Sequence, residues 1–292
     1  MARITVVGSS NTDMVIKTER FPSPGETIVG GEFFLFAGGK GANQAVAAAR
    51  LGGEVRFVAR VGNDVFGQQA LTGFEREGID CSLVVTDEET ASGTALITIN
   101  REGENSIVVA PGANARLSPE QLEKLTLQDS EYALTQLETP LDTVIALSEA
   151  GGRLVLNPAP AQSLPDSLLR QLFLITPNES ELALLTGMKV TGTAEIARAA
   201  QALVDRGVQQ VVVTLGAAGA YYTDGQQSFT VAAPSVRAID TTAAGDVFNG
   251  ALVVALSEGK DMREAIRFAI TAASLSVTRM GAQASAPYRH EL

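Results

Sequence analysis

The chain has 292 residues, of which 45% are hydrophobic, and its formal net charge at pH 7 is −11. A chain of this length can bury a large core, and α/β folds of this size often form one domain. The acidic balance argues against nucleic acid as a partner, because proteins that bind DNA or RNA need a basic surface. Without a signal-like segment or an apolar run of roughly eighteen residues, we expect a cytoplasmic protein with no membrane partner.

Two scarce residue types exclude several kinds of active site. The single cysteine, Cys81, allows no internal disulfide and no Cys-based zinc site. The single histidine, His290, lies two residues from the C-terminus, where we expect an exposed and inert side chain. Catalytic triads and HExxH zinc sites need His at a rigid position. An enzyme built from this chain must therefore use carboxylates, Lys, backbone amides or a bound ion.

Apolar, strand-like runs alternate with helix-like segments along the chain. Strands buried on both faces are expected at 3–9, 54–62, 132–138, 153–160, 172–179 and 210–217. Helices are expected at 41–52, 66–78, 140–151 and 193–207, and two more at about 246–256 and 262–278. This alternation predicts a three-layer α/β fold, an open and mainly parallel sheet with helices on both faces. We expect a single domain over residues 1–292, because no repeat or linker interrupts the pattern.

Two regions break the alternation. The segments at about 14–37 and 92–112 contain alternating residues and turn residues but little helical periodicity. This pattern predicts hairpins of a small antiparallel sheet that stands off the parallel one. They form either a lid over a ligand or ordinary edge strands, and the pattern alone favours neither.

Polar and glycine-rich segments follow several predicted strands. Ligands of open α/β sheets bind beyond the carboxyl ends of the strands, so these segments are candidates for the site. Asn11 and Asp13 follow the first strand, Glu138 follows a later one, and GGKGANQ (38–44) leads into a helix. The glycines of GGKGANQ would let backbone N–H groups face a ligand, and this mixture of donors and acceptors suits a polyhydroxylated ligand. A simple glycine-rich turn remains the alternative. The segment FAGGKGAN lacks the spacing of a Walker A loop.

The segment DTTAAGDVFNGAL (240–252) predicts a second functional helix start. Three small residues precede Asp246, which falls in the first turn of an apolar helix. Backbone amides at the positive end of a helix form an anion site, and Asp246 could accept a proton from an attacking hydroxyl. The alternative is an acid that merely stabilises the helix dipole.

The segment PNESELALLTG is ambiguous. Asn178 followed by Glu181 matches an N-cap with an acid three residues later, which alone could explain both residues. The functional alternative is that the acid orients a hydrated Mg²⁺ ion.

With these segments in order, the chain resembles the ribokinase-like (PfkB) family of carbohydrate kinases. GGKGANQA (38–45) carries the resemblance on the sugar side and DTTAAGDVFNGAL on the catalytic side, with PNESE and TLGAAG between them in the family's order. The resemblance extends to SVTRMGAQAS near the C-terminus. GGKGANQ and the NTD segment after the first strand look most like the family members that phosphorylate D-ribose.

The resemblance implies roles for the matching residues. Asp246 would be the base on the sugar's primary hydroxyl, and Ala243, Ala244 and Gly245 would form the anion hole. The sugar would be held by Asn11, Asp13, Gly38, Gly39, Lys40, Asn43 and Glu138. ATP would be bound by Asn178, Thr214, Gly216, Gly219 and Gly245, with Glu181 acting on Mg²⁺ through water. A K⁺ ion beside the anion hole would be held by Asp240, Thr242, Ser276, Arg279, Gly281 and Ser285. In addition, two subunits would pair through the lid into a homodimer.

The implied activity is ATP-dependent phosphorylation of the 5-hydroxyl of D-ribose. Deoxyribose, another furanose or keto-sugar, and a nucleoside remain open as substrates. A non-catalytic sugar-binding protein on the same fold is the alternative from another class, and it predicts a broken catalytic Asp or anion hole. Both segments are intact in this sequence.

Overall fold

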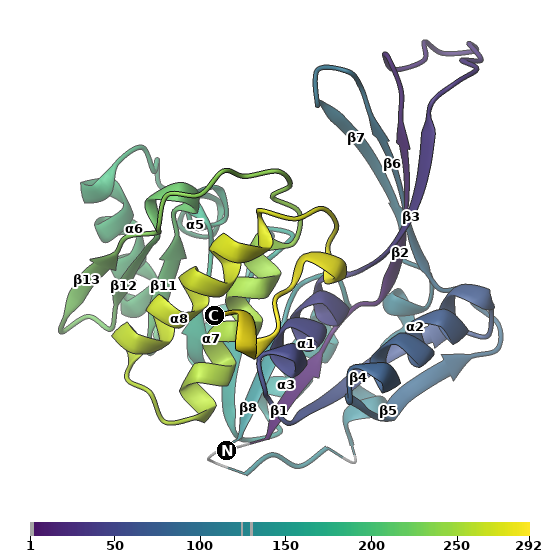
Figure 1. The fold of residues 1–292 in the computed structure, drawn as a ribbon. Helices are drawn as coiled ribbons and strands as arrows, with labels where there is room; N and C mark the ends of the chain where they lie inside the picture. The colour runs from purple at the N-terminus through teal and green to yellow at the C-terminus, as the bar shows by residue number, and fades with distance from the viewer. Residues whose placement is uncertain (1–2, 124, 129–130) are drawn as a thin grey trace.

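The structure is a computed structural model that describes residues 3–123, 125–128 and 131–292 (Figure 1). In this part of the chain, nine strands form the central sheet in the order β13-β12-β11-β10-β9-β8-β1-β4-β5. The strands from β11 to β5 are parallel, and β12 and β13 are antiparallel. The bounds are β1 Ile4–Val7, β4 Val55–Gly62, β5 Asp80–Asp87, β8 Tyr132–Thr135, β9 Arg153–Leu156, β10 Leu172–Ile175, β11 Val211–Thr214, β12 Ala220–Thr223 and β13 Ser228–Val231.

Helices cover both faces of this sheet, which confirms the predicted three-layer fold. One core lies beneath α1 Lys40–Arg50, α2 Val65–Arg76, α7 Ala244–Ser257 and α8 Met262–Ser276. The other lies beneath α3 Leu141–Ser148, α4 Asp166–Leu169, α5 Glu179–Thr186 and α6 Thr193–Asp205. Strand β1 contributes Ile4 and Val6 to the first core and Val7 to the second. Burial on both faces explains why its sequence is a continuous apolar run.

Three strands at the ends of the sheet were not predicted. Strand β5 has exposed and half-buried residues along most of its length, so it lacks the apolar run of a central strand. Strands β12 and β13 are four residues each and pair as a hairpin after the glycine-rich segment 215–219. The edge strands β5 and β13 have mixed burial and so a weak hydrophobic signal, whereas β12 is fully buried but only four residues long.

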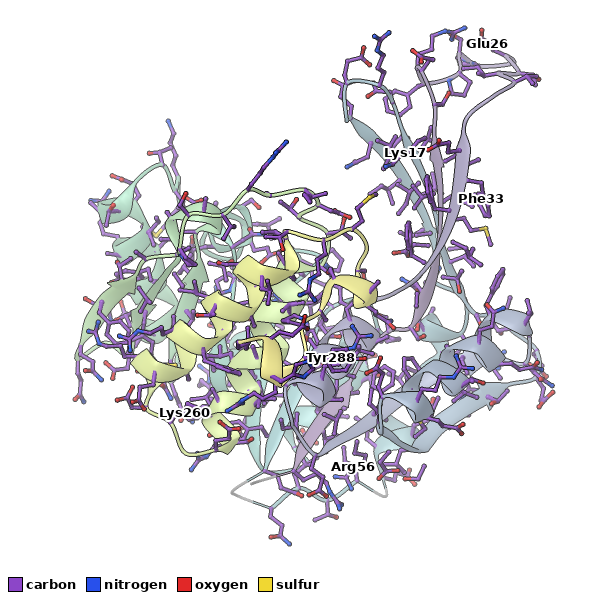
Figure 2. All side chains as sticks on the ribbon, viewed as in Figure 1. Lys17, Glu26, Phe33, Arg56, Lys260 and Tyr288 are labelled. Carbon is purple, nitrogen blue, oxygen red and sulfur yellow. The ribbon has the colours of Figure 1, made fainter. Side chains whose placement is uncertain are left out.

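A second sheet of four strands stands off the main body (Figure 1). It contains β2 Asn11–Lys17, β3 Glu32–Gly38, β6 Gly93–Ile99 and β7 Asn105–Ala110. The two hairpins, β2–β3 and β6–β7, are antiparallel as predicted, and the pairing of β2 with β6 that joins them is parallel. Phe33 on this sheet points away from the main body (Figure 2) and is 61% exposed.

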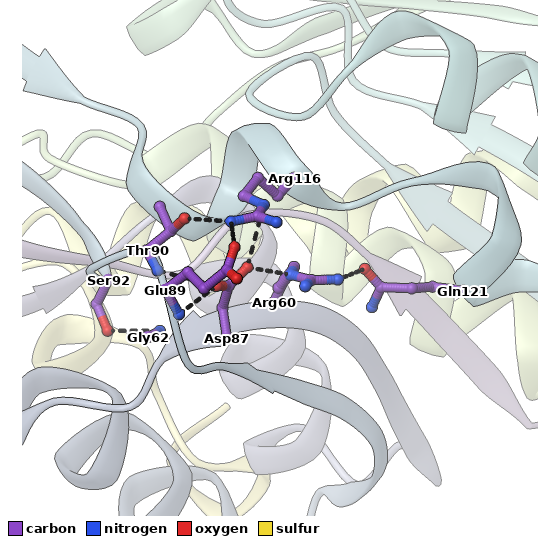
Figure 3. Close-up of polar contacts among 8 residues, drawn as sticks. All are labelled: Arg60, Gly62, Asp87, Glu89, Thr90, Ser92, Arg116 and Gln121. Carbon is purple, nitrogen blue, oxygen red and sulfur yellow. Dashed lines mark hydrogen bonds and ion pairs between the residues drawn. The ribbon is translucent and has the colours of Figure 1, made fainter.

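A buried carboxylate fixes the point where the chain enters β6 (Figure 3). Asp87 ends β5 and is paired with Arg60 at 2.7 Å and with Arg116 at 3.4 Å. It also accepts hydrogen bonds from the backbone N–H groups of Glu89 and Thr90, both at 2.9 Å. This network ties the base of the small sheet to the edge of the large one. None of the helices in the described residues has the length and apolar character needed to cross a membrane.

Candidate active site

The predicted sugar-side residues meet where β1 and β8 end and α1 begins. One oxygen of Glu138, Oε2, accepts a hydrogen bond from Ser9 Oγ at 2.5 Å and from the Lys40 backbone N–H at 2.9 Å. The N–H of Gly41 donates to Ser9 Oγ at 3.3 Å, and the N–H of Ala42 donates to the Ser9 carbonyl at 2.8 Å. The expectation that backbone N–H groups of this motif face a ligand is therefore wrong for these three groups, which the protein itself satisfies.

The glycines of the motif allow close approach of protein to protein. A Cβ atom on Gly41 would lie 2.6 Å from the backbone of Gly8 and Ser9, and one on Gly38 would meet the Asp13 carboxylate. Gly39 adopts a φ of +88°, in the left-handed region that favours glycine. These contacts bring the first turn of α1 against the end of β1, and this sets the position of the side chains that follow on the helix.

Four carboxylates act on the side chain of Lys40. Burial would lower the pKa of Lys40, but Asp246, Glu138, Glu181 and Asp13 together raise it. Burial raises the pKa of Asp13 to about 6, with further contributions from Glu138 and Asp246. The structure therefore places an ammonium group among acids contributed by β2, α5, α7 and the segment after β8, as required of residues that share one site.

Asp246 is buried at the start of α7, with 6% of its surface exposed. Its Oδ2 accepts a hydrogen bond from Asn43 Nδ2 at 2.9 Å, and its Oδ1 accepts one from Gln44 Nε2 at 3.0 Å. Burial raises the pKa of Asp246, whereas Lys40 and the two amides oppose that rise. The other side-chain atom of Asn43, Oδ1, is buried without a hydrogen-bond partner among the described residues. A buried unpaired acceptor beside a carboxylate suits a ligand hydroxyl.

Asn11 is held by a residue that the sequence did not reveal. Asn114 in the 3₁₀-helix η1 Gly112–Arg116 donates from Nδ2 to Asn11 Oδ1 at 2.7 Å and to the Ser10 carbonyl at 3.1 Å. Its own Oδ1 accepts the Ser10 N–H at 2.9 Å. Because its oxygen is occupied, Asn11 has its NH₂ group left to donate to a ligand.

The start of α7 offers backbone donors. Ala243, the residue before the helix, has a φ of +58° and is the single non-glycine residue with positive φ in the described part of the chain. The N–H groups of Ala243, Gly245 and Asp246 have no hydrogen-bond partner among the described residues. The N–H of Ala244 donates to the Thr241 carbonyl at 3.3 Å, so this predicted donor is engaged. The remaining donors lie at the positive end of a helix, where an anion is stabilised.

Buried polar side chains connect Asp246 with Gly245, the residue before it. Gln44 Nε2 also donates to Asn157 Oδ1 at 3.0 Å, and Asn157 donates to the Thr176 carbonyl at 3.3 Å. Thr176 Oγ1 donates to Asn249 Oδ1 at 2.6 Å, and Asn249 Nδ2 donates to the Gly245 carbonyl at 2.8 Å. None of these residues was assigned a role from the sequence. The available signals were Gln44 inside GGKGANQ and Asn157 directly after a strand.

The predicted nucleotide residues lie at the ends of β10 and β11. Asn178 and Glu181 form the predicted capping box of α5: Asn178 Oδ1 accepts the Glu181 N–H, and Glu181 accepts the Asn178 N–H, both at 2.8 Å. Burial raises the pKa of Glu181 against the effects of the Asn178 N–H and Lys40. Residues 178 and 214 form a parallel β-bridge, and Gly216 and Gly219 bracket a 3₁₀ turn with φ values of +55° and +104°. Four of the five predicted ATP residues, all except Gly245, therefore lie on neighbouring segments.

Asp240 joins two of the predicted ion-binding segments. Its Oδ1 accepts Thr242 N–H at 2.9 Å and Thr242 Oγ1 at 2.6 Å, and its Oδ2 accepts the Gly281 N–H at 2.9 Å. Ser276 and Ser285 are both 1% exposed. The side chain of Arg279 pairs with Glu291 at 2.6 Å, which leaves its carbonyl as the available ligand.

Arg50 anchors the segment that contains Ser285. Its Nη1 donates to the carbonyls of Gln283 and Ala286 at 2.7 and 2.9 Å, on either side of that serine. On its other side the guanidinium pairs with Glu77 at 2.6 Å. A cationic side chain from α1 thus fixes the main chain of the last predicted ion-binding segment.

Residues 1–289 match the profile of the pfkB family carbohydrate kinases. The chain belongs to this family. The resemblance carried by the two glycine-containing motifs is thereby confirmed, and with it the assignment as an ATP-dependent carbohydrate kinase.

Similar proteins cover nearly the whole of this pfkB chain. The ribokinase of Haemophilus influenzae is 45% identical over 294 residues, which cover 99% of this chain and 96% of the relative. The deoxyribokinase of Salmonella typhi is 38% identical over 291 residues, which cover 97% and 95%. The structure of Arabidopsis thaliana ribokinase complexed with ribose and ATP has a TM-score of 0.89 and 34% identity, with coverage of 99% and 97%. The pfkB fold of this chain is therefore shared from end to end.

Proposed function

We propose that the protein is a ribokinase, which transfers the γ-phosphoryl group of ATP to the 5-hydroxyl of D-ribose. The observation that carries this proposal is the position of Asp246. Its buried carboxylate lies between the amides that start α7 and the cluster of Lys40, Asn43 and Asp13. The similarity of the chain to ribokinases supports the choice of sugar.

The sugar site supplies acceptors and donors for several hydroxyl groups. Asp13 and the unpaired Oδ1 of Asn43 accept hydrogen bonds, and the NH₂ group of Asn11 and the Lys40 ammonium donate them. Gly38 leaves room for the Asp13 carboxylate, and Gly39 shapes the chain beside it. Glu138 keeps Oε1 for the sugar while Oε2 holds α1 in place.

The reaction is an in-line phosphoryl transfer. The 5-oxygen of the sugar forms a bond to the γ-phosphorus, the bond from that phosphorus to the β,γ-bridging oxygen breaks, and the hydroxyl proton passes to Asp246. Because the transition state is loose, positioning and charge stabilisation matter more than the strength of the base. The N–H groups of Ala243 and Gly245 are placed to stabilise the transferring phosphoryl oxygens.

ATP and Mg²⁺ are assigned to the segments after β10 and β11. Asn178, Thr214, Gly216 and Gly219 would line the nucleotide site, with Gly245 at its phosphate end. In the described residues, no group of three or more His, Cys, Asp or Glu side chains is arranged to hold a metal. This fits Mg²⁺ held by phosphates and water, with Glu181 acting through water. The ion would neutralise charge on the phosphates.

A K⁺ ion is assigned to the segments that Asp240 joins. The donors would be Asp240, Thr242 and Ser285 with the carbonyls of Ser276, Arg279 and Gly281, an oxygen-only set that suits a hard cation. The ion would supply positive charge that supports residues 243–245, the anion loop.

The lid is assigned to residues 14–37 and 92–112, and we propose that it also forms a homodimer. Register places Ile16 opposite Phe33 and Leu96 opposite Val108, on the face of this sheet opposite to Asp13. These four side chains are 45–66% exposed. Exposed apolar patches of this kind mark protein interfaces. Phe33→Glu should yield monomers in sedimentation, whereas Val65→Glu on α2 should not. We place the enzyme in the cytoplasm, where ATP is available.

The decisive experiment measures ADP release with ATP and Mg²⁺ on D-ribose, 2-deoxy-D-ribose, D-fructose and adenosine, in K⁺ and in Na⁺. Ribose-dependent turnover that is higher in K⁺ is expected. Asp246→Asn should reduce kcat by at least about 100-fold, because a general base contributes this much. Asp142→Asn is the matched control, since Asp142 is an exposed acid in the first turn of α3. Equal activity of the two variants would reject Asp246 as the base.

Deoxyribose is the second candidate substrate, because the similar Salmonella typhi protein is a deoxyribokinase. A polar group of the site left without its hydroxyl partner costs about 1–3 kcal/mol. A kcat/KM for deoxyribose equal to or above that for ribose would replace the first proposal with this one.

A further inference from the structure

Gln44 touches the proposed catalytic base from the side of the protein core. It is fully buried, and its Nε2 donates to Asp246 Oδ1 and to Asn157 Oδ1, both at 3.0 Å. Both protons of this NH₂ group are therefore used. The other oxygen of Asp246 is bonded to Asn43. The two amides thus hold the carboxylate by one bond on each oxygen, which fixes its plane.

The direction of the Gln44 amide is set by a residue that Asp246 does not contact. Gln136, which is 1% exposed, donates from Nε2 to Gln44 Oε1 at 2.6 Å. Its own Oε1 is buried without a partner among the described residues and lies against Gly8, where a Cβ atom would be 2.2 Å away. A buried unpaired carbonyl in a native core calls for an explanation.

The reverse orientation of the Gln136 amide would bring hydrogen-bond acceptors together. If Gln136 turned its oxygen toward Gln44, two acceptors would face each other unless Gln44 also turned. Gln44 would then present its oxygen to the oxygens of both Asp246 and Asn157. Leaving one carbonyl of Gln136 unpaired avoids one acceptor–acceptor contact if Gln136 alone turned, or two if Gln44 turned with it. The chain of amides therefore has one favourable direction, which ends at Asp246.

We propose that Gln44, oriented by Gln136, is a positioning residue that holds the Asp246 carboxylate ready to accept the proton of the sugar hydroxyl. This inference rests on the proposed kinase function. It assigns a role to two residues that touch neither the sugar-side donors nor the anion loop, and it explains why two glutamines are buried in the core beside the site.

The pH dependence of the reaction gives a test that a purely structural role would not pass. Asp246 is also influenced by Lys40, Glu138, Asp13 and Glu181. Those groups are unchanged when Gln44 is replaced. Burial already raises the pKa of Asp246, and the Gln44 donor opposes the rise. Removal of this donor should raise the pKa of Asp246 further. A base with a higher pKa becomes protonated, and so inactive, at a higher pH.

The first variant is Gln44→Met, which keeps an unbranched side chain of similar length but removes the amide. We expect kcat to fall by about tenfold, as for loss of one hydrogen bond to a charged group. The acid limb of kcat/KM should move to higher pH, and KM for the sugar should change less than about threefold. A wild-type kcat and acid limb, or a loss confined to KM, would overturn the proposal.

The second variant is Gln136→Glu, which tests the orientation at a distance from Asp246. Below its pKa the neutral acid can donate its O–H to Gln44 Oε1, as Gln136 does. Above it the carboxylate needs a donor and draws the Gln44 NH₂ group away from Asp246. Burial raises the pKa of a carboxylic acid, so kcat should fall as the pH rises into the neutral range. A profile like that of the wild type would contradict the role of Gln136.

The two changes should not be additive, because the second acts through the first residue. In Gln44→Met, adding Gln136→Glu should alter the pH profile by less than half of its effect alone. ¹³C NMR of the Asp carboxyl groups in the substrate-free protein tests the inference independently of the kinase proposal. The Asp246 signal is assigned by its loss in Asp246→Asn. In this measurement Gln44→Met should raise the pH at which Asp246 titrates, whichever sugar the enzyme phosphorylates. An unchanged titration would overturn the inference even if wild-type turnover on ribose is high.

Discussion

Asp13→Asn should stabilise the fold while it weakens sugar binding. Asp13 lies on β2, and no hydrogen bond from the described residues contributes to the pKa of its carboxylate. Burial, together with Glu138 and Asp246, raises its pKa from 3.8 to about 6. A raised pKa means that folding disfavours the ionised form. The destabilisation is therefore absent below about pH 4, grows between pH 4 and pH 6, and is complete above pH 6.

The size of the effect follows from the two pKa values. A rise from 3.8 to about 6 corresponds to about 3 kcal/mol at pH 7.5, at 1.36 kcal/mol for each pKa unit. Solvent reaches part of this side chain, so we expect about 2–3 kcal/mol at pH 7.5 and about half of that at pH 5. Asn has nearly the shape of Asp and no charge. The substitution should therefore raise the melting temperature by roughly 5 °C at pH 7.5.

Urea unfolding of Asp13→Asn at pH 5 and at pH 7.5 measures this gain, with Asp142→Asn as the exposed control. A variant that is no more stable than the wild type at pH 7.5, or whose gain does not shrink at pH 5, would refute the reasoning. Calorimetry provides the functional half of the test. Because the ionised acid is the better acceptor, ribose affinity of the wild type should rise with pH up to about 6 and then level off. The variant should lose this dependence.

Four further substitutions test backbone and loop geometry. Ala243→Gly should raise the stability measured in thermal unfolding by about 0.5–1 kcal/mol, because the left-handed φ of +58° strains alanine but not glycine. The kcat of this variant should stay within twofold of the wild-type value. A loss of stability would show that no strain is present. Gly41→Ala should lower the free energy of unfolding by about 2 kcal/mol or more, because the new Cβ would lie 2.6 Å from backbone atoms. Gly73→Ala in α2 places its Cβ where nothing lies within 4 Å, so it should raise that free energy by up to about 1 kcal/mol. Equal values for the two variants in urea unfolding would contradict both expectations. Arg50→Met should raise the K⁺ concentration for half-maximal activity by about tenfold, since it frees two carbonyls beside the proposed ion site, and an unchanged value would separate Arg50 from that site.

The parts of the fold and site that the sequence could predict are those with a local signal. A strand buried on both faces, such as β1, has an apolar run that depends only on its own residues. The capping box of Asn178 and Glu181 and the place of Asp246 in the first turn of α7 are also local, because each depends on residues three or four positions apart. The edge strand β5, with its mixed burial, carries no such signal.

The parts that could not be predicted depend on contacts between distant residues. Asn114 orients Asn11 across 103 positions, and Gln44 reaches Asp246 across 202. An amide side chain in a sequence shows what it can donate and accept but not which partner it meets. Placing these residues requires the register of the sheet and the tilt of the helices that cover it, and neither is encoded in the spacing of a motif.

The two helix starts of the site show how far this limit extends. The segments GGKGA at the start of α1 and TAAGD at the start of α7 look alike in sequence. Both contain small residues that leave backbone N–H groups accessible where a helix begins. In α1, Ser9 and Glu138 approach from other elements and accept the first N–H groups. In α7, no group in the described residues approaches Gly245 or Asp246 in this way. A helix start becomes an anion site only when the rest of the fold leaves its donors unpaired. The proposed anion site at the start of α7 therefore depends as much on the absence of a packed acceptor among the described residues as on the residues of the motif itself.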